Sequence, residues 1–389
     1  MNEFDRPRSR KGTASVKWDF LEKNCGGSDL LPLWVADMDF PSPPEVVEAL
    51  TKRAEEGIYG YTDHSADYFS ALEEWNRKRH GWRCDPSWVV SVPGVVPALN
   101  MAVRAFTKPG DKVLVQRPVY YPFMNSIELN GARVINSPLV LRDRRYRMDP
   151  KDLEEKLSDP RCRMMILCSP HNPVGRVWEE GELRLVADLC REKGVILVSD
   201  EIHSDLVFPG FRHRPLLSID PSYSSFTLLC TSPSKSFNLA GLQCANMIVP
   251  DPILRRGILE ERERLGLFLP NFFGGVALEA AYRYGEPWLE RLMTYLKGNL
   301  DLLKRFLGER LPEAILTEPE GTYLAWVDLR GVERDWPRAE KILLERAKVA
   351  YDPGVLFGPE GEGYIRINLA CPRSLLQEAL ERTAQAFGR

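Results

Sequence analysis

Lys235 stands among small hydroxyl residues, in Ser232-Pro233-Ser234-Lys235-Ser236, and not in a charged surface stretch. A lysine in a buried polar pocket can lose its proton and then attack an aldehyde. Ser232 and Ser234 are suited to bind a phosphate beside it. The alternative is a solvated loop lysine, which most lysines are.

Asp200 directly follows the apolar run 195–199. A carboxylate at the end of a buried strand is costly without a partner, and a protonated ring nitrogen of a cofactor is one such partner. His203, three positions further on, can reach the same ring or belong to the core. Asp200 has two alternative explanations, a helix cap and a magnesium ligand.

Asn172 and Arg366 are two further candidates for ligand binding. Asn172 lies in SPHNPVG (residues 169–175), where its amide can donate to a phenolate oxygen, although Asn-Pro is also ordinary turn chemistry. Arg366 interrupts the apolar run 364–368 and needs an anion. Its planar guanidinium matches a carboxylate with two hydrogen bonds, and a structural salt bridge is the alternative.

The segment Pro93-Gly94-Val95-Val96-Pro97 joins a predicted strand to a predicted helix. We expect Gly94 to permit a tight turn and Pro97 to occupy the first helical position. The backbone N–H groups of Val95 and Val96 can then hold a phosphate at the positive end of the helix dipole. A plain strand-to-helix turn explains the segment without a ligand.

These residues follow elements that alternate between short β-rich runs and amphipathic helices. The pattern predicts an α/β fold, with a mostly parallel sheet covered by helices on both faces. In such sheets, ligands bind beyond the carboxyl ends of the strands. The expected strands are residues 89–92, 112–116, 133–138, 164–168, 195–199, 226–231 and 245–249, and the expected helices are 97–107, 122–130, 149–157 and 179–192.

The character of the chain changes after about residue 285, where long charged helices and further strands follow. We expect a long helix over 288–311, strands at 323–329, 349–351 and 364–368, and a final helix over 374–386. The domain prediction is therefore an N-terminal segment (1–45) that joins the small domain, a large domain (46–285), and a small C-terminal α+β domain (286–389).

Bulk composition excludes several classes of protein. A net charge of −3 and a pI near 6.1 give no general attraction to nucleic acid or to an anionic membrane. No apolar run is long enough to span a bilayer, and the N-terminus lacks the apolar region of a signal peptide, so we expect a cytoplasmic protein. The eight cysteines form no CxxC pair and the five histidines have no metal-binding spacing, so we expect no metal site.

Three motifs in this order, SPHNPVG, SDEIHSD (199–205) and SPSKSFNLAG (232–241), resemble the fold-type I pyridoxal 5′-phosphate (PLP) enzymes of the aspartate aminotransferase superfamily. The resemblance covers nearly the whole chain and implies a seven-stranded type of sheet. It implies that Lys235 binds PLP as a Schiff base, Asp200 pairs with the pyridine nitrogen, Asn172 contacts the ring O3′, and Arg366 binds the substrate α-carboxylate. It also implies an aromatic residue stacked on the pyridine, which is Tyr120 or its neighbour Tyr121.

A narrower resemblance lies in LWVADMDF (33–40) and in the pairs Gly60-Tyr61 and Tyr120-Tyr121, which are similar to the MalY/PatB branch of cystathionine β-lyases and other carbon–sulfur lyases. It implies a homodimer with shared active sites, in which Tyr61 reaches the neighbouring subunit's cofactor phosphate and substrate. We expect the segment near Ala36 to help hold the substrate carboxylate. Many aminotransferases carry a phosphate-binding arginine in G-x-R, where this chain has Gln243.

The predicted function is therefore a PLP-dependent β-lyase. It acts on cystathionine or related cysteine thioethers and gives a thiol such as homocysteine, pyruvate and ammonia. Lys235 is expected to remove the Cα proton as general base. An aminotransferase of similar fold is the alternative, and a regulatory binding protein that retains PLP is a further alternative from another class.

Overall fold

The computed structural model describes residues 2–389, and its centre is a seven-stranded sheet. Every neighbouring pair is parallel except the two that involve β10, which runs antiparallel to both its neighbours. The strands β2, β9, β8, β7, β3 and β4 therefore end at one edge. This confirms the predicted mostly parallel α/β sheet. Its order is β2 (Val89–Val92), β10 (Ala245–Ile248), β9 (Thr227–Thr231), β8 (Ile196–Asp200), β7 (Cys162–Cys168), β3 (Lys112–Val115) and β4 (Arg133–Asn136).

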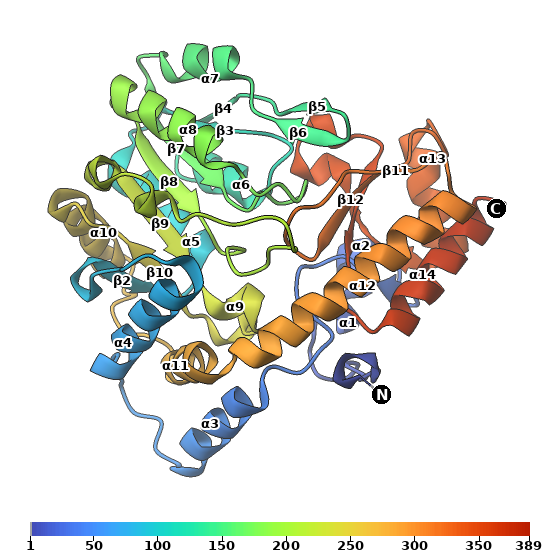
Figure 1. The fold of residues 1–389 in the computed structure, drawn as a ribbon, viewed down its shortest axis with the longest axis horizontal. Coiled ribbons are helices and arrows are strands. Elements are labelled where there is room, and N and C mark those ends of the chain that lie inside the picture. Colours follow the sequence, from blue (N-terminus) through green and yellow to red (C-terminus); the bar gives the residue numbers. More distant parts are fainter. Residues whose placement is uncertain (1) are drawn as a thin grey trace.

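Helices cover both faces of this sheet (Figure 1). One face packs on α5 (Val95–Phe106), α6 (Pro122–Glu128) and α10 (Pro252–Arg264), and the other on α7 (Pro150–Leu157) and α8 (Glu180–Lys193). Strand β7 supplies both cores, because Met164 and Ile166 face the first set and Met165 and Leu167 the second. A strand buried on both faces reads as a continuous apolar run, which is the pattern of this segment.

Local sequence explains where several of these helices begin and end. Asp149 caps α7 by accepting hydrogen bonds from the N–H groups of Lys151 and Asp152. Glu179 and Glu182 form a capping box at the start of α8, and Gly194 ends it at φ +66°. Helix α5 begins two residues earlier than predicted, so Pro97 is its third residue and not its first.

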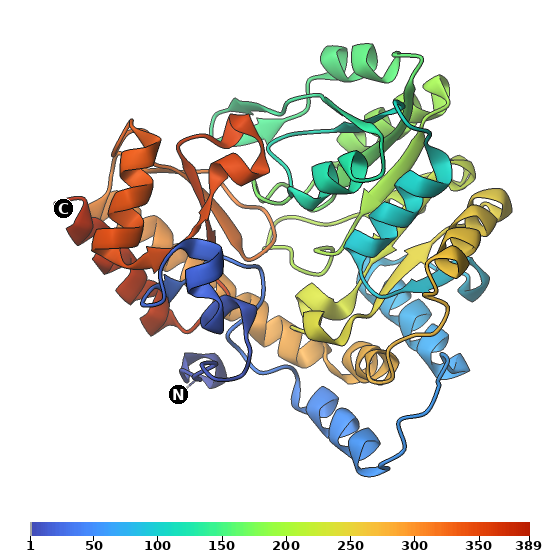
Figure 2. The same cartoon turned by 180° about the vertical axis from the view of Figure 1, so that it is seen from behind.

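A second unit lies beside the sheet, around the long helix α12 (Glu286–Arg310) and the C-terminal helix α14 (Arg373–Ala386) (Figure 2). Its sheet is antiparallel. It also contains α13 (Trp336–Lys341), which continues into a π-helical turn over residues 342–347. The sheet order is β11 (Ile315–Leu316), β12 (Leu324–Asp328), β15 (Tyr364–Asn368) and β14 (Asp352–Pro353).

The N-terminal segment lies against this second unit. Strand β1 (Leu31–Pro32) pairs in parallel with β13 (Val349–Ala350), so the predicted strand at 349–351 joins β1 and not the four-stranded sheet. The Asn368 side chain donates to the carbonyls of Val35 and Asp37 at 2.8 and 2.7 Å. These contacts support our proposed grouping of residues 1–45 with 286–389, with residues 46–285 as the large domain.

The remaining elements connect or cover these units. Helices α3 and α4 both pack on α11, and α9 lies between the large sheet and α12 (Figure 1). A hairpin of β5 and β6 leads into α7. The bounds of these remaining elements, with those of the two short N-terminal helices, are α1 (Val16–Asp19), α2 (Leu21–Cys25), α3 (Pro44–Glu55), α4 (Ala66–Trp75), β5 (Val140–Arg142), β6 (Arg145–Arg147), α9 (Pro233–Ser236) and α11 (Gly274–Tyr284).

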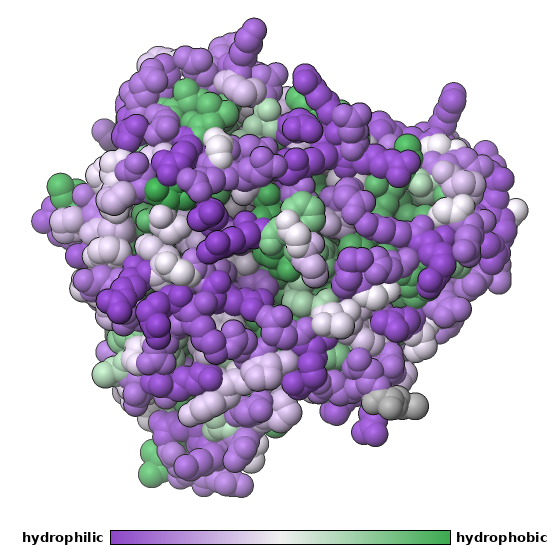
Figure 3. All heavy atoms as spheres, in the orientation of Figure 1, coloured by the Kyte–Doolittle hydropathy of each residue, from purple (hydrophilic) through white to green (hydrophobic). Residues whose placement is uncertain are grey.

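The face shown in Figure 3 is mainly hydrophilic, with patches of hydrophobic residues at the upper left, in the middle and on the right. None of the helices within residues 2–389 has the length and apolar character needed to cross a membrane. The same residues contain no group of three or more His, Cys, Asp or Glu side chains placed to hold a metal ion.

Candidate active site

A cavity opens at the edge where β2, β7, β8 and β9 end and α5 begins. The structure gathers there side chains and backbone that are up to two hundred residues apart in sequence. The residues singled out from the sequence that line it are Ala36, Gly94, Val95, Val96, Tyr120, Asn172, Asp200, His203, Ser232, Ser234 and Lys235.

Lys235 reaches this cavity from the short helix α9, which directly follows β9. Ser232 caps the helix by accepting from the N–H of Ser234 at 3.1 Å. The Lys235 Nζ donates to the carbonyl of Ala36 at 2.6 Å. Burial, helped by the charge of Arg366, lowers the pKa of Lys235 to about 8, against the opposing effect of two nearby carboxylates. The amine is therefore far closer to its neutral, nucleophilic form than an exposed lysine.

Asp200 lies at the carboxyl end of β8 and is 3% exposed. Burial raises its pKa to about 7, although a hydrogen bond from the N–H of Ile202 opposes this shift. Residues 201–205 form turns and no helix begins there, so Asp200 does not cap a helix. The described residues also hold no metal cluster around it. A cationic group in the cavity is the partner that would stabilise its charge.

His203 lines the same cavity and is 3% exposed. Among the described residues, its Nδ1 has no hydrogen-bond partner. Burial and the positive charges of Lys235 and Arg366 lower its pKa to about 3. The imidazole is therefore neutral at physiological pH and can contact a ligand ring.

Arg366 and Asn172 are joined across the two units. Arg366 Nη1 donates to Asn172 Oδ1 at 3.0 Å, which leaves the Asn172 amide nitrogen as its donor for a ligand. Arg366 Nη2 also forms an ion pair with Asp352, its cross-strand neighbour on β14. The structural salt bridge weighed for Arg366 is therefore present. Its Nε is buried and has no partner among residues 2–389, so capacity for another anion remains.

The opposite end of the cavity presents donors suited to a phosphate. Val95 and Val96 form the first turn of α5, where N–H groups have no intrahelical acceptor. Ser232 and Ser234 lie beside them, 2.9 Å apart between hydroxyl oxygens. Gly94 has φ 174°, which is extended backbone open to any residue, so the bend before α5 does not require the conformational freedom of glycine.

The three predicted aromatic residues differ in position. Tyr120 lines the cavity, and its N–H donates to the carbonyl of Asn172 at 3.1 Å. Its neighbour Tyr121 does not line this cavity and lies in another cleft, so of the two it is Tyr120 that can stack on a cofactor. Tyr61 is 98% exposed and also lies outside the chain's own cavity. Its predicted role across a dimer stays a prediction.

Several residues that serve the site escaped the sequence analysis. Tyr323 is fully buried and donates to the carbonyl of Ala36 at 3.0 Å, beside Lys235. Asn238 holds the N-terminal segment, since its Oδ1 accepts from the N–H of Met38 at 3.0 Å. Asn238 also has φ +57°, and its place within the lysine motif was a signal that could have been used. Asp352, the ion-pair partner of Arg366, lies in no sequence motif that could have indicated its role.

Asp205, the last residue of SDEIHSD, is the centre of a hydrogen-bond network beneath the helix that carries Lys235. Its carboxylate accepts from Ser236 Oγ at 2.6 Å and from Trp75 Nε1 at 3.1 Å, and His80 Nε2 lies 3.1 Å from it. All four side chains are buried, and Ser236 follows Lys235 directly in α9. This network therefore fixes the orientation of the helix that carries the amine.

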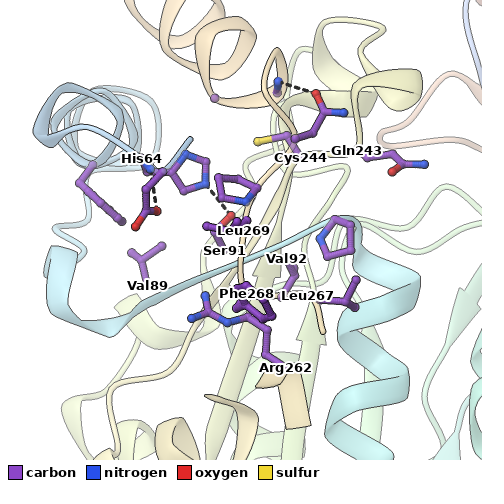
Figure 4. Close-up of a pocket in the computed structure, with 17 residues that line it drawn as sticks. His64, Val89, Ser91, Val92, Gln243, Cys244, Arg262, Leu267, Phe268 and Leu269 are labelled. Carbon is purple, nitrogen blue, oxygen red and sulfur yellow. Dashed lines mark hydrogen bonds between the residues drawn. The ribbon is translucent and has the colours of Figure 1, made fainter. Parts of the chain in front are cut away.

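A second cavity of about 300 Å³ adjoins the site and shares Pro93, Gln243 and Cys244 with it (Figure 4). His64 faces Ser91 in this cavity, with 2.7 Å between Nε2 and Oγ. Arg262 lines it from the last turn of α10, and Phe268 lines it from the segment that follows this helix. Phe268 and Leu269 line it and are exposed, and the exposed side chains of Ile58, Tyr59 and Tyr61 shortly precede Asp63 and His64, which also line it.

Known proteins resemble this chain over nearly its whole length. The family model described as Aminotransferase class I and II matches residues 28–382. Cystathionine beta-lyase PatB of Bacillus subtilis (strain 168) is 43% identical over 384 residues, which cover 99% of each protein. Protein MalY of Escherichia coli (strain K12) is 37% identical and covers 98% of this chain and 97% of MalY.

Solved structures agree with these relatives. Cystalysin from Treponema denticola, which contains a pyridoxal 5′-phosphate cofactor, has a TM-score of 0.96 at 37% identity and covers 100% of this chain and 99% of its own. The PLP-bound C–S lyase from Staphylococcus hominis has a TM-score of 0.94 at 33% identity and covers 99% and 98% of the two chains.

Proposed function

The chain belongs to the class I and II aminotransferase family, and we propose that within this family it is a PLP-dependent carbon–sulfur β-lyase. Its substrate is cystathionine or a related cysteine thioether. Water and the thioether give a free thiol, pyruvate and ammonia. The observation that carries the proposal is the meeting of Lys235, Asp200 and Asn172 at one cavity, with Arg366 bonded to Asn172 behind its wall, in a chain 43% identical to a cystathionine β-lyase.

The residues of the cavity fit PLP. Asp200 is a buried acid that favours a cationic ring nitrogen, and the Asn172 amide nitrogen is a donor for the phenolic oxygen. The hydroxyls of Ser232 and Ser234, with the first N–H groups of α5, suit the phosphate. When bound, PLP supplies an aldehyde for condensation with amines and a ring that withdraws electrons from the reacting carbon.

The chain's own residues hold the substrate and move its protons. Arg366 binds the α-carboxylate through its unpartnered Nε and its Nη atoms, beside the backbone of Ala36. Lys235 takes the proton from Cα, a role for which a pKa of about 8 is well matched to neutral pH. Loss of the thiolate from Cβ then follows, because the Cα–H electrons form the new Cα–Cβ double bond.

We also propose that the protein works as a homodimer. The exposed apolar residues Ile58, Tyr59, Tyr61, Phe268 and Leu269 lie on segments that border the cavity of Figure 4, next to the PLP cavity. In the dimer, Tyr61 reaches the other subunit's phosphate and substrate. Sedimentation velocity should show that the protein is a dimer. The Tyr61→Phe variant should bind PLP more weakly but remain a dimer. A monomeric active enzyme would contradict this.

A cytoplasmic location is consistent with the free cysteines. All eight are unpaired thiols and seven are buried, as expected in a reducing compartment.

The central test is pyruvate release from L-cystathionine by purified protein, without added keto acid. Wild type and the surface variant Lys341→Ala should both release pyruvate and free thiol, whereas Lys235→Ala should release neither above background. Conversion of cystathionine to its 2-oxo acid, with amination of an added keto acid and without release of thiol or pyruvate, would identify an aminotransferase instead. Absence of turnover together with absence of a visible PLP absorption band would contradict the proposal as a whole.

A further inference from the structure

A cleft of about 520 Å³ lies between the N-terminal segment and the second unit. Its walls are mainly apolar and aromatic, and include Trp34, Tyr121, Trp336, Leu343 and Tyr351. Its volume is in the range of small-molecule sites, and its lining of apolar walls with a few polar groups is typical of them.

The cleft borders the candidate active site at two points. Tyr121 lines the cleft and Tyr120 lines the PLP cavity, with their ring centroids 5.5 Å apart. Arg366 contacts both sides, since Nη1 binds Asn172 of the cavity and Nη2 pairs with Asp352 of the cleft. Arg366 therefore lies between the two, and a substrate whose α-carboxylate it holds would have the cavity on one side and the cleft on the other.

The charged residues that line the cleft are all acidic. Its charged lining residues are Glu340 and Asp352, and among residues 2–389 no Lys, Arg or His lines it. Asp352 is neutralised by Arg366. Glu340 is only partly buried and has no ion-pair partner within the described chain, so it is the free carboxylate of the cleft.

We propose that this cleft is the subsite for the leaving arm of the thioether, and that Glu340 makes it prefer arms that carry an ammonium group. The inference rests on the proposed β-lyase function and names its substrate class. The apolar walls receive the carbon chain beyond sulfur, and Glu340 pairs with the distal amine. The thioethers selected are those whose arm is a few carbons long and ends in, or bears, an amino group.

Two matched substrates test this subsite. S-(2-aminoethyl)-L-cysteine and S-propyl-L-cysteine have arms of equal length and differ in a terminal ammonium versus a methyl group. We expect kcat/KM for pyruvate release to favour the aminoethyl compound in the wild type. Glu340→Gln should lower that preference by about fivefold, the upper part of the range for a solvent-accessible ion pair. Glu340→Lys should reverse it.

The control is Glu345→Gln, which removes a carboxylate from the adjoining turn but outside the cleft. It should leave the preference unchanged, and thermal melting should show all variants folded. Equal changes on both substrates, or a preference unaffected by Glu340→Gln, would overturn the subsite. Failure of the wild type to release pyruvate from either compound or from cystathionine would instead overturn the β-lyase function.

Discussion

Arg366 Nη1 and Asn172 Oδ1 are 3.0 Å apart, although the two residues are 194 positions apart in the chain and lie in different units. This hydrogen bond ties the proposed carboxylate-binding arginine to the amide that faces the proposed cofactor ring. The orientation of the amide therefore depends on the position of the second unit. We therefore expect binding of the substrate carboxylate and polarisation of the cofactor to be coupled through this contact.

Replacement of Arg366 by lysine should lower kcat/KM for thioether cleavage by about 10- to 100-fold. The variant keeps the charge but loses the planar geometry, and a hydrogen bond to a charged group is worth about 1.5–3 kcal/mol. Steady-state kinetics of pyruvate release measures the effect. Arg330→Lys is a matched control, because Arg330 also pairs with an aspartate, Asp328, but lies outside the cavity. Similar losses in both variants would contradict the assigned role.

Asp200 should make the stability of the apoenzyme fall as pH rises. Its folded pKa of about 7 lies above the unfolded value of about 3.9, so the folded state binds more protons between these values. The free energy of unfolding should therefore decrease from about pH 4 to pH 7 and level off above. Urea denaturation of the PLP-free protein at several pH values measures this. Asp200→Asn should abolish that part of the slope, and an identical pH profile in the variant would contradict the prediction.

Lys235 should react with PLP at a rate that follows its own titration. With a pKa of about 8, the neutral fraction of the amine increases about tenfold per pH unit below pH 8 and then saturates. We expect the rate of recovery of the visible band, when apoenzyme is mixed with PLP, to rise from pH 6 and to level near pH 8. A rate that keeps rising to pH 10 would show that the amine has the pKa of an exposed lysine.

Gln243→Arg should tighten PLP binding. Gln243 lines the cofactor cavity together with Ser232 and Ser234. A new charged hydrogen bond to the phosphate should lower the Kd for PLP by roughly tenfold. Equilibrium titration of apoenzyme by fluorescence gives the Kd. An unchanged Kd would mean that the side chain at this position does not reach the phosphate.

Asp205→Asn should destabilise the protein and loosen the lysine helix. The carboxylate accepts from Ser236, Trp75 and His80, and an amide has only one oxygen for these donors. A buried donor left without a partner costs about 1–3 kcal/mol. Thermal melting measures the loss, and the Ser236→Ala variant should show a smaller effect. If the Asp205→Asn variant melted at the same temperature as the wild type, the network would not contribute to the stability of the fold.

Much of the site was predictable from the sequence, since its residues directly follow strands with strong local patterns. The run before Asp200 is apolar because β8 is buried on both faces, and parallel strands necessarily end at one edge. This is why Asp200, Asn172, Ser232 and Lys235 could be expected to meet. The start of α5 was predicted two residues too late, because backbone torsions at a turn depend on the packing around it.

The amino-acid sequence by itself determined the alternating elements, the strand-end residues and the resemblance to PLP enzymes. Only the tertiary structure decided that Tyr120 and not Tyr121 enters the cavity, that Arg366 pairs with Asp352, and that Glu340 lines a cleft beside them. Such choices follow from strand register and from the contact of two units. They join residues far apart in the chain, and no local pattern encodes the distance between them.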